Sequence, residues 1–242
     1  MRERSDRDLA SLTTLRLGGP AKRLIEVATD AELVDAVRAA DRAGEPLLVL
    51  GGGSNVVIAD EGFDGTVVLV RTRGVDVSAD ACSGATVTVS AGEAWEPFVE
   101  RAVREQWVGV EALSGIPGLV GAVPIQNVGA YGQEVAQTIA GVRTYDRAAQ
   151  ETRTFAAADC GFAYRNSRFK AEPDRFVVLS VTFQLPLGDL STPIRYAELA
   201  RRLDVELGQR APAKAVRDAV LELRRSKGMV LEPGDHDTWS AG

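Results

Sequence analysis

The stretch GIPGLVGAVPIQNVGAYG, residues 115–132, holds five glycines and two prolines among mostly apolar neighbours. It lies inside a longer run, residues 112–133, that carries no charge. Glycine lets backbone segments approach closely, so this composition is typical either of a packed corner where segments cross or of a wall around a ligand. The polar residues Gln126, Asn127 and Tyr131 favour a ligand, because a flat apolar ring needs a few hydrogen bonds to its edge.

The uncharged run reaches the length of a membrane span, but its composition argues against one. Pro117 and Pro124 would break the helix, and Gln126 and Asn127 would lie in hydrocarbon. The chain of 242 residues has a net charge of −6 and a pI near 5.0, which argues against binding to nucleic acid or an anionic membrane. We therefore expect residues 112–133 to form buried, irregular backbone, in a protein that binds neither nucleic acid nor a membrane.

Cysteine and histidine usage indicates a reducing compartment and argues against a metal site. The N-terminal residues contain no apolar segment of the kind that a secretory signal has. Cys82 and Cys160 are isolated, which is typical of free thiols in a reducing cytoplasm. His236 is the only histidine and no Cys/His cluster is present, so the sequence predicts no metal site.

The first residues of the chain are expected to form a small α/β unit. Thr29 and Glu32 have the spacing of a capping box at the start of a helix that Gly44 ends. Short apolar runs predict strands at 47–50, 56–59 and 66–70, with GGGSN (51–55) as the turn between the first two.

GGGSN can be compared with two nucleotide-binding motifs, and it matches neither. Val56 stands where the third glycine of the Rossmann fingerprint belongs, and the Gly-Lys-Ser/Thr of a P-loop is absent. The loop still offers a row of backbone N–H groups on glycines, which have no Cβ, and further donors on the side chains of Ser54 and Asn55. Such a nest can cradle a phosphate. A plain tight connection remains the alternative, since Gly and Asn favour turns for steric reasons.

The remainder of the chain indicates a second α+β domain. The strict alternation of TVTVS (86–90) predicts a half-buried strand. Pro212 and Gly228 have the positions of a first helical residue and of a residue just past a helix end. Helices are predicted at 93–106, 196–207 and 212–228, and further strands at 141–146, 151–156 and 176–185.

Two basic clusters remain. FAYRNSRFK (162–170) sets three basic residues between aromatic ones, which by itself is typical of a solvated turn. Arg224, Arg225 and Lys227 lie at the end of a predicted helix, where cations interact favourably with the helix dipole. No Ser/His/Asp or Cys/His arrangement is evident, so hydrolase chemistry has little support.

Five motifs occur in order along the chain: TLRLGGPA (14–21), VLGGGSNVVIAD (49–60), SGIPGLVGAVPIQNVGAYGQEV (114–135), FAYRNSRFK and LRRSKGMVLEP (223–233). Together they closely resemble the MurB family, the UDP-N-acetylenolpyruvoylglucosamine reductases. The resemblance covers essentially the whole chain, and the GIPG…PIQN…GAYG run is its most specific part.

The resemblance implies an α+β fold in which two α+β subdomains form an FAD-binding module of the vanillyl-alcohol-oxidase (PCMH) type. On this basis we expect the first subdomain over 1–70, with the pyrophosphate loop, and the second over 71–210, with the flavin wall. Residues 211–242 are expected to hold a helix and the start of a third, substrate-binding domain that is largely missing.

The activity that the resemblance implies is FAD-dependent, NADPH-using reduction of UDP-N-acetylglucosamine enolpyruvate to UDP-N-acetylmuramate, a cytoplasmic step of peptidoglycan precursor synthesis. Arg165 matches the family's catalytic arginine, whose guanidinium stabilises charge that develops on the substrate. The substrate-binding positions of the family match Tyr131, Arg165, Arg224 and Lys227. Its FAD-binding positions match Leu50, Gly51, Gly52, Gly53, Ser54, Asn55, Val56, Pro117, Gly118, Gly121, Ala122, Ile125, Gln126, Asn127 and Gly129. We expect a monomer.

The sequence departs from the family pattern at HDTWSAG (236–242). In the family this segment continues into a Ser-Phe-Phe run whose serine donates the proton that completes the reduction, and Ser240 lies two residues too early to be that serine. Three interpretations stay open. The one we favour is a truncated reductase that is inactive as it stands. The others are a non-catalytic FAD-binding protein and a related FAD oxidase with a different substrate.

Overall fold

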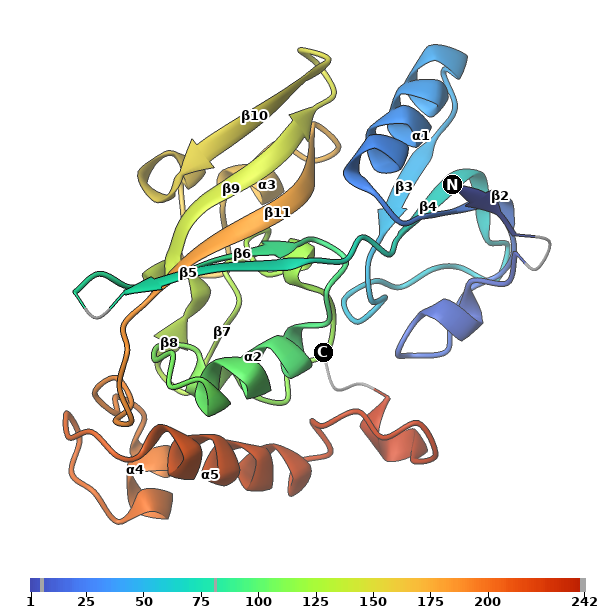
Figure 1. Cartoon of the computed structure of the whole chain (residues 1–242). Helices are drawn as coiled ribbons and strands as arrows, with labels where there is room; N and C mark the ends of the chain where they lie inside the picture. Colours follow the sequence, from blue (N-terminus) through green and yellow to red (C-terminus); the bar gives the residue numbers. More distant parts are fainter. Residues whose placement is uncertain (5–6, 81, 240–242) are drawn as a thin grey trace.

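The chain folds around two sheets of unlike topology (Figure 1). The structure is a computed structural model that describes residues 1–4, 7–80 and 82–239. The first sheet has the order β1-β2-β4-β3, in which β2, β4 and β3 are parallel and β1 is antiparallel to β2. Its strands are β1 (Arg2–Glu3), β2 (Ala21–Val27), β3 (Leu47–Leu50) and β4 (Phe63–Val70). The strands predicted at 47–50 and 66–70 are confirmed.

Helix α1 (Asp30–Ala43) connects β2 to β3 and buries Leu33 and Val37. The Thr29 hydroxyl accepts a hydrogen bond from the backbone N–H of Glu32 at 3.2 Å. The Glu32 carboxylate accepts one from the N–H of Ala28 at 2.8 Å, one residue before the N-cap. Gly44, in a left-handed conformation with φ 62°, ends the helix. The helix start and end read from the sequence are therefore confirmed.

The second sheet is antiparallel throughout, in the order β10-β9-β11-β6-β5. Helix α2 (Trp95–Arg104) buries Trp95 and Phe98, whose rings lie 6.0 Å and 5.0 Å from that of Phe183 in the sheet. The strands are β5 (Val75–Asp80), β6 (Gly84–Ser90), β9 (Ile139–Asp146), β10 (Glu151–Ala156) and β11 (Phe176–Leu185). Every strand that the sequence predicts in this half is confirmed.

The strand predicted at 56–59 is wrong. Strand β3, which precedes the glycine loop, lies at the edge of its sheet and pairs with β4, and residues 56–59 do not pair with it. The backbone carbonyl of Ala59 instead accepts hydrogen bonds from the N–H groups of Gly19 and Gly62, and Val57 is 73% exposed. Four apolar residues in a row do not distinguish a strand from a loop that packs on one side only.

Two short helices at the C-terminal end share a core of their own, separate from the sheets. These are α4 (Ala197–Leu203) and α5 (Ala213–Arg225), which bury Leu199, Val216 and Val220 together. The helix predicted at 196–207 ends earlier because Asp204 takes a left-handed conformation with φ 54°. Pro212 is the N-cap of α5 and not its first helical residue, and the C-cap is Ser226, two residues before Gly228.

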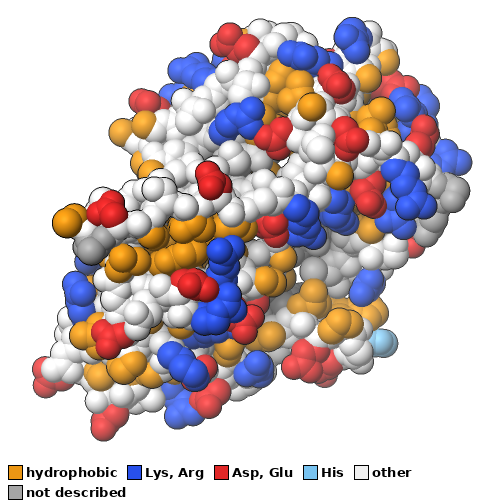
Figure 2. All heavy atoms as spheres, viewed as in Figure 1, with side chains coloured by type: hydrophobic (Ala, Val, Ile, Leu, Met, Phe, Trp, Pro, Cys, Tyr) orange, Lys and Arg blue, Asp and Glu red, His pale blue; other side chains and the backbone are white. Residues whose placement is uncertain are grey.

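The five-stranded sheet and the helical pair α4–α5 lie on opposite sides of α2 (Figure 1). On the face shown in Figure 2, a band of hydrophobic side chains lies between β5 and α2, and charged side chains of both signs cover much of the remainder. None of the helices in the described part of the chain has the length and apolarity that crossing a bilayer would need. The bounds proposed at 70 and 210 stay a prediction. The two sheets lie on either side of residue 70 in the sequence. In contrast, α4 and α5 lie on either side of residue 210 and pack together.

Helix α1 also joins the two sheets. Its Asp41 carboxylate lies 2.6 Å from the Arg147 guanidinium, which follows β9. The Arg38 guanidinium donates to the Tyr145 hydroxyl at 3.0 Å. These contacts fix the relative position of the two sheets and so the width of the space between them.

Candidate functional site

The glycine loop, residues 51–55, packs directly against the uncharged run 115–132. A Cβ on Gly52 would lie 2.8 Å from the Cα of Gly118, which itself has φ 112°. The Ser54 hydroxyl donates to the carbonyl of Pro117 at 3.3 Å. The packed-corner interpretation is therefore right for these glycines, and their close packing also creates the shared wall of a cavity.

The glycine loop presents backbone donors to that cavity. Among the residues that the structure describes, no acceptor is found for the backbone N–H groups of residues 52–55. Behind the loop, Nη1 of Arg71 donates to the carbonyl of Gly51 at 3.3 Å, and burial lowers the pKa of this guanidinium from its ordinary value. Free N–H groups with a cation behind them are the elements of an anion-binding nest.

The loop cavity, about 350 Å³, lies between the glycine loop and the uncharged run. Twelve of the predicted cofactor-binding residues line it: Leu50, Gly51, Gly52, Gly53, Ser54, Asn55, Val56, Pro117, Gly118, Ala122, Ile125 and Gln126. The structure thus brings together two motifs that are widely separated in the sequence.

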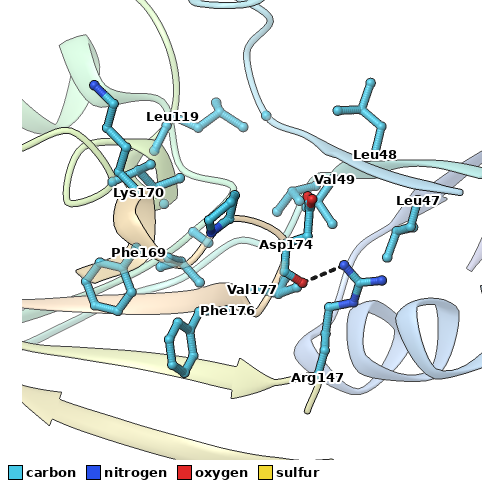
Figure 3. Close-up of a pocket in the computed structure, with 18 residues that line it drawn as sticks. Leu47, Leu48, Val49, Leu119, Arg147, Phe169, Lys170, Asp174, Phe176 and Val177 are labelled. Carbon is cyan, nitrogen blue, oxygen red and sulfur yellow. Dashed lines mark hydrogen bonds between the residues drawn. The ribbon is translucent and has the colours of Figure 1, made fainter. Parts of the chain in front are cut away.

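The inter-sheet cleft, also about 350 Å³, opens from the loop cavity and shares Gly51, Leu119 and Lys170 with it. Figure 3 shows Leu47, Leu48 and Val49 of β3 on one side and Phe169, Phe176 and Val177 on the other. At one end, the Arg147 guanidinium donates to the backbone carbonyl of Asp174 at 2.5 Å. Gly121, another predicted cofactor residue, lines this cleft. Its walls are mostly apolar.

The cationic cavity, about 270 Å³, adjoins the loop cavity on the opposite side and shares Ile116, Gln126 and Val128 with it. All four predicted substrate-binding residues, and Gly129 of the predicted cofactor set, line it: Gly129, Tyr131, Arg165, Arg224 and Lys227. The three cavities therefore form a continuous series, apolar at one end, with backbone donors at its middle and cations at its other end.

Arg165 is exposed to solvent and has a left-handed backbone, with φ 52°. Its guanidinium donates to the carbonyl of Gly129 at 3.0 Å. The loop that carries it is fixed by Ser167, which is buried, caps the short helix α3 (Arg168–Ala171) and donates to the carbonyl of Ile125 at 2.6 Å. Arg165 is thus held at the edge of the cationic cavity by the wall that it faces.

The other cations of this cavity come from the end of α5 and just beyond it. Arg224 is only 4% exposed, donates to the carbonyl of Met229 at 2.7 Å, and has its pKa lowered by burial. Lys227 lies 2.7 Å from the Glu198 carboxylate, whose hydrogen bond raises the pKa of the ammonium. Burial raises the pKa of the Tyr131 hydroxyl. The cavity therefore contains three cationic side chains, Arg165, Arg224 and Lys227, beside the phenol of Tyr131.

Asn127 is the one predicted cofactor residue that lines none of the three cavities. Its side chain is buried and donates to the Glu134 carboxylate at 2.8 Å and to the carbonyl of Ala163 at 3.1 Å. Its side-chain oxygen accepts from the N–H of Ala136 at 3.1 Å. The amide joins the uncharged run to FAYRNSRFK, and its role as a cofactor contact stays a prediction.

Several lining residues have no counterpart among the predicted site residues. Some are apolar residues inside a motif, such as Ile116, Leu119 and Val123 in the uncharged run, and others, such as Phe176 and Val177, lie outside every motif. Lys170 is different, because it is a charged residue of FAYRNSRFK and lines both the loop cavity and the cleft. These lining residues include Leu47, Leu48, Val49, Ile116, Leu119, Val123, Val128, Lys170, Phe176 and Val177. Across the described residues, no group of three or more His, Cys, Asp or Glu could hold a metal ion.

A family model described as an FAD binding domain matches residues 21–154, more than half of the chain, and the chain belongs to this family. The matched residues include most of both sheets, the glycine loop and the uncharged run. The fold is also similar to that of 6-hydroxy-D-nicotine oxidase from Arthrobacter nicotinovorans, at a TM-score of 0.55 and 18% identity over 84% of this chain and 47% of that one. That likeness concerns the fold alone.

Among proteins of this class, the chain is similar over its length to UDP-N-acetylenolpyruvoylglucosamine reductases. It is 60% identical to that of Cutibacterium acnes over 237 residues, 98% of this chain and 63% of the relative. It is 57% identical to that of Streptomyces coelicolor, over 100% of this chain and 62% of the relative. The crystal structure of MurB from Thermus caldophilus matches at a TM-score of 0.63 and 25% identity, over 94% of this chain and 69% of that one.

These matches confirm the resemblance to MurB and the α+β, FAD-binding class of the fold. The chain spans about 63% of the length of the curated relatives that it matches.

Proposed function

We propose that this chain is the flavin-binding part of a reductase that uses NADPH to reduce UDP-N-acetylglucosamine enolpyruvate to UDP-N-acetylmuramate, in the cytoplasm, during peptidoglycan precursor synthesis. The observation that carries the proposal is the continuous series of three cavities, with an anion nest at its middle. FAD has a long apolar and aromatic body with a diphosphate near its centre, and the series has the corresponding order of surfaces.

The residues present fit this cofactor. The N–H groups of residues 52–55, which have no acceptor within the described chain, would hold the diphosphate, and the glycines there leave no Cβ between backbone and ligand. The apolar inter-sheet cleft would take the adenosine half, and Gln126 with the uncharged run would surround the flavin ring. When bound, FAD supplies hydride chemistry, accepting hydride from NADPH and passing it to an acceptor.

The four residues of the cationic cavity would hold the substrate. Arg224 and Lys227 offer positive charge to the diphosphate of a UDP-sugar, and Tyr131 offers a neutral hydroxyl. Hydride addition to the β-carbon of an enolpyruvyl ether leaves negative charge on the carboxylate side of the substrate. Arg165, already held in place by Gly129, would stabilise that charge as it develops.

We also propose that these 242 residues by themselves complete the flavin-binding part of the site and not the reduction. The family's proton-donor serine has no counterpart among them, and Ser240 lies outside the described residues. Proton transfer from a positioned group contributes about 10²–10⁴-fold to such reactions. We further propose that the chain is a monomer and binds neither nucleic acid nor a membrane.

The test is to incubate the purified chain with FAD, remove free flavin by gel filtration and record the visible spectrum. We expect a yellow protein with one flavin per chain and a flavin band shifted from that of free FAD. The loaded chain should oxidise NADPH without yielding the saturated sugar. A chain that stays colourless after incubation would overturn the proposal.

A further inference from the structure

We propose that Lys170 is a positioning residue with two contacts. Its ammonium supplies positive charge to the anionic centre of the bound dinucleotide, and it also holds the backbone carbonyl of Arg165. Cofactor binding and the placement of Arg165 are thereby coupled through one side chain. The cofactor half of this inference rests on the proposed FAD site, whereas the contact with Arg165 does not.

The first observation is the position of Lys170 in the series of cavities. Lys170 lines both the inter-sheet cleft and the loop cavity, where the adenosine half and the diphosphate would meet. Figure 3 shows its side chain directed away from Asp174. Leu119 lines the same two cavities, and a Cβ on Gly51 would lie 3.5 Å from its side chain, so the glycine loop forms part of the wall that Lys170 shares.

The second observation is the charge balance around the ammonium. Glu172, the nearest acidic residue along the chain, pairs with Arg168 and Arg175 instead. Within the described part of the chain, no carboxylate lies within ion-pair distance (4.0 Å) of the Lys170 ammonium. Its charge is therefore available to an anion, and a phosphate oxygen is a strong acceptor for an ammonium donor.

The third observation links this ammonium to Arg165. Nζ of Lys170 donates to the backbone carbonyl of Arg165 at 2.9 Å. Arg165 has a left-handed backbone that residues other than glycine seldom adopt, so contacts are needed to hold it. The Lys170 backbone is itself firmly placed, because its N–H and that of Phe169 both donate to the buried Ser167 cap.

These contacts let one side chain serve two sites. The stem of Lys170 lies along the cavity wall, and three N–H donors on the ammonium allow one bond to Arg165 and further bonds to a phosphate. Arginine has a comparable charge and reach, so Lys170→Arg should preserve both functions, whereas the uncharged Lys170→Met should lose both.

The first experiment measures FAD and riboflavin affinity by flavin fluorescence for the unchanged chain, Lys170→Met and Lys170→Arg. We expect Lys170→Met to weaken FAD about tenfold and to flatten its salt dependence, with riboflavin, which has no phosphate, changed less than about twofold. Lys170→Arg should stay within about threefold for FAD. Equal affinities of FAD for the unchanged chain and Lys170→Met would overturn the cofactor half.

The second experiment needs no cofactor. Trypsin cleaves after arginine, and the carbonyl of Arg165 that Lys170 holds belongs to the scissile bond. Cleavage between Arg165 and Asn166, followed by mass spectrometry, should be about fivefold faster in Lys170→Met, because that carbonyl is released. Lys170→Arg should restore the slow rate. An unchanged rate in Lys170→Met would overturn the contact with Arg165.

Lys214 provides the matched control. It is an exposed lysine on α5 that pairs with Asp218 at 2.6 Å and lines none of the three cavities. Lys214→Met should therefore leave FAD affinity and cleavage after Arg165 as in the unchanged chain, and an equal effect of both substitutions would overturn the inference. If the unchanged chain itself binds no FAD, the proposed function fails. The proteolysis experiment still tests whether Lys170 holds the carbonyl of Arg165.

Discussion

Asn127 illustrates how one residue type can have two interpretations. An amide in an apolar run indicates a hydrogen bond, but not the partner of that bond. The structure gives all three of its bonds to the chain itself, at Glu134, Ala163 and Ala136. Its backbone has φ 47°, a left-handed conformation that asparagine tolerates better than most residues. Asn127 therefore has a structural task whether or not it also contacts a cofactor.

We predict that Asn127→Asp destabilises the flavin-free chain by about 2–3 kcal/mol. The substitution removes both donors and sets a carboxylate beside the carboxylate of Glu134. Urea unfolding of the flavin-free protein measures the free energy. A loss confined to the flavin-loaded protein would contradict the structural role and favour a direct contact with the cofactor.

The site residues differ in how far the sequence could predict them. Arg165, Arg224 and Lys227 were predicted through motifs, and all three line one cavity. Leu119 and Lys170 were not predicted as site residues, because their importance depends on how the two sheets enclose the cleft, which no local pattern shows. The sequence could not predict the ion pair of Lys227 with Glu198 either, since that pair depends on how α5 packs against α4.

Among the elements, the glycine loop and the uncharged run act as one unit. Their contact is backbone against backbone, so it has little room to adjust. A Cβ on Gly52 would come within 2.8 Å of Gly118, closer than a real contact allows, whereas a Cβ on Gly234 would meet open space. Glycine is required at position 52 by this approach, and the cavity depends on it.

We predict that Gly52→Ala weakens FAD binding about tenfold or more, because it separates the two walls of the loop cavity. Gly234→Ala is the matched control and should bind FAD as the unchanged chain does. Fluorescence titration measures both affinities. Similar affinities for the two variants would contradict the role of the close contact.

The strands show where sequence patterns succeed. Strict alternation located β6 and a long apolar run located β11, because both strands are buried within one large sheet. Strand β10 was also predicted, although Phe155 is its one buried residue. The run at 56–59 failed because it packs as a loop, with Ile58 buried and Val57 exposed and with the carbonyl of Ala59 bonded to the N–H groups of residues 19 and 62.

The end of β9 contains a charged pair that makes stability depend on pH. Asp146 is 1% exposed and accepts hydrogen bonds from Arg175 and from the N–H groups of Ala148 and Ala149. The hydrogen bond from Arg175, opposed in part by burial, lowers the pKa of this carboxyl below its ordinary value of 3.8. A lowered pKa contributes stability that is fully present above the ordinary value and is lost as the pH falls through the lower one.

We predict that Asp146→Asn costs about 2 kcal/mol at pH 7 and that the difference from the unchanged chain shrinks below about pH 4. Denaturant unfolding at pH 7, 4 and 2.5 measures the free energies. Asp76→Asn, at an exposed position on β5, is the control and should cost little at any pH. A difference that stays constant down to pH 2.5 would contradict the assignment.

For the whole molecule, Glu111 connects the helical pair to the remainder. It is fully buried and accepts hydrogen bonds from the N–H of Gly109 at 2.6 Å, the N–H of Thr192 at 2.9 Å and the Gln133 side chain at 2.8 Å. Thr192 begins the segment that leads to α4 and α5, and α5 leads to Arg224 and Lys227. One carboxylate thus anchors the segment that presents the cationic cavity.

We predict that Glu111→Ala costs about 3 kcal/mol or more, because it removes the acceptor of three hydrogen bonds, of which those from Gly109 and Gln133 are buried. Hydrogen exchange measured by mass spectrometry should quicken over residues 191–225 and stay slow in β9 and β11. Glu105→Ala, on the exposed end of α2, is the control. A uniform rise in exchange across both sheets would contradict the local role.

The position of the loop cavity and the cleft between two sheets has a thermodynamic consequence. A ligand that fills them touches both sheets at once, so it binds the assembled pair and not either half. Mass action then links loading to folding, and free ligand at 100 times its dissociation constant adds about 2.7 kcal/mol to the stability of the assembled chain. The supply of flavin in the cell would therefore set how much of this chain persists in a folded form, in addition to how much of it is loaded.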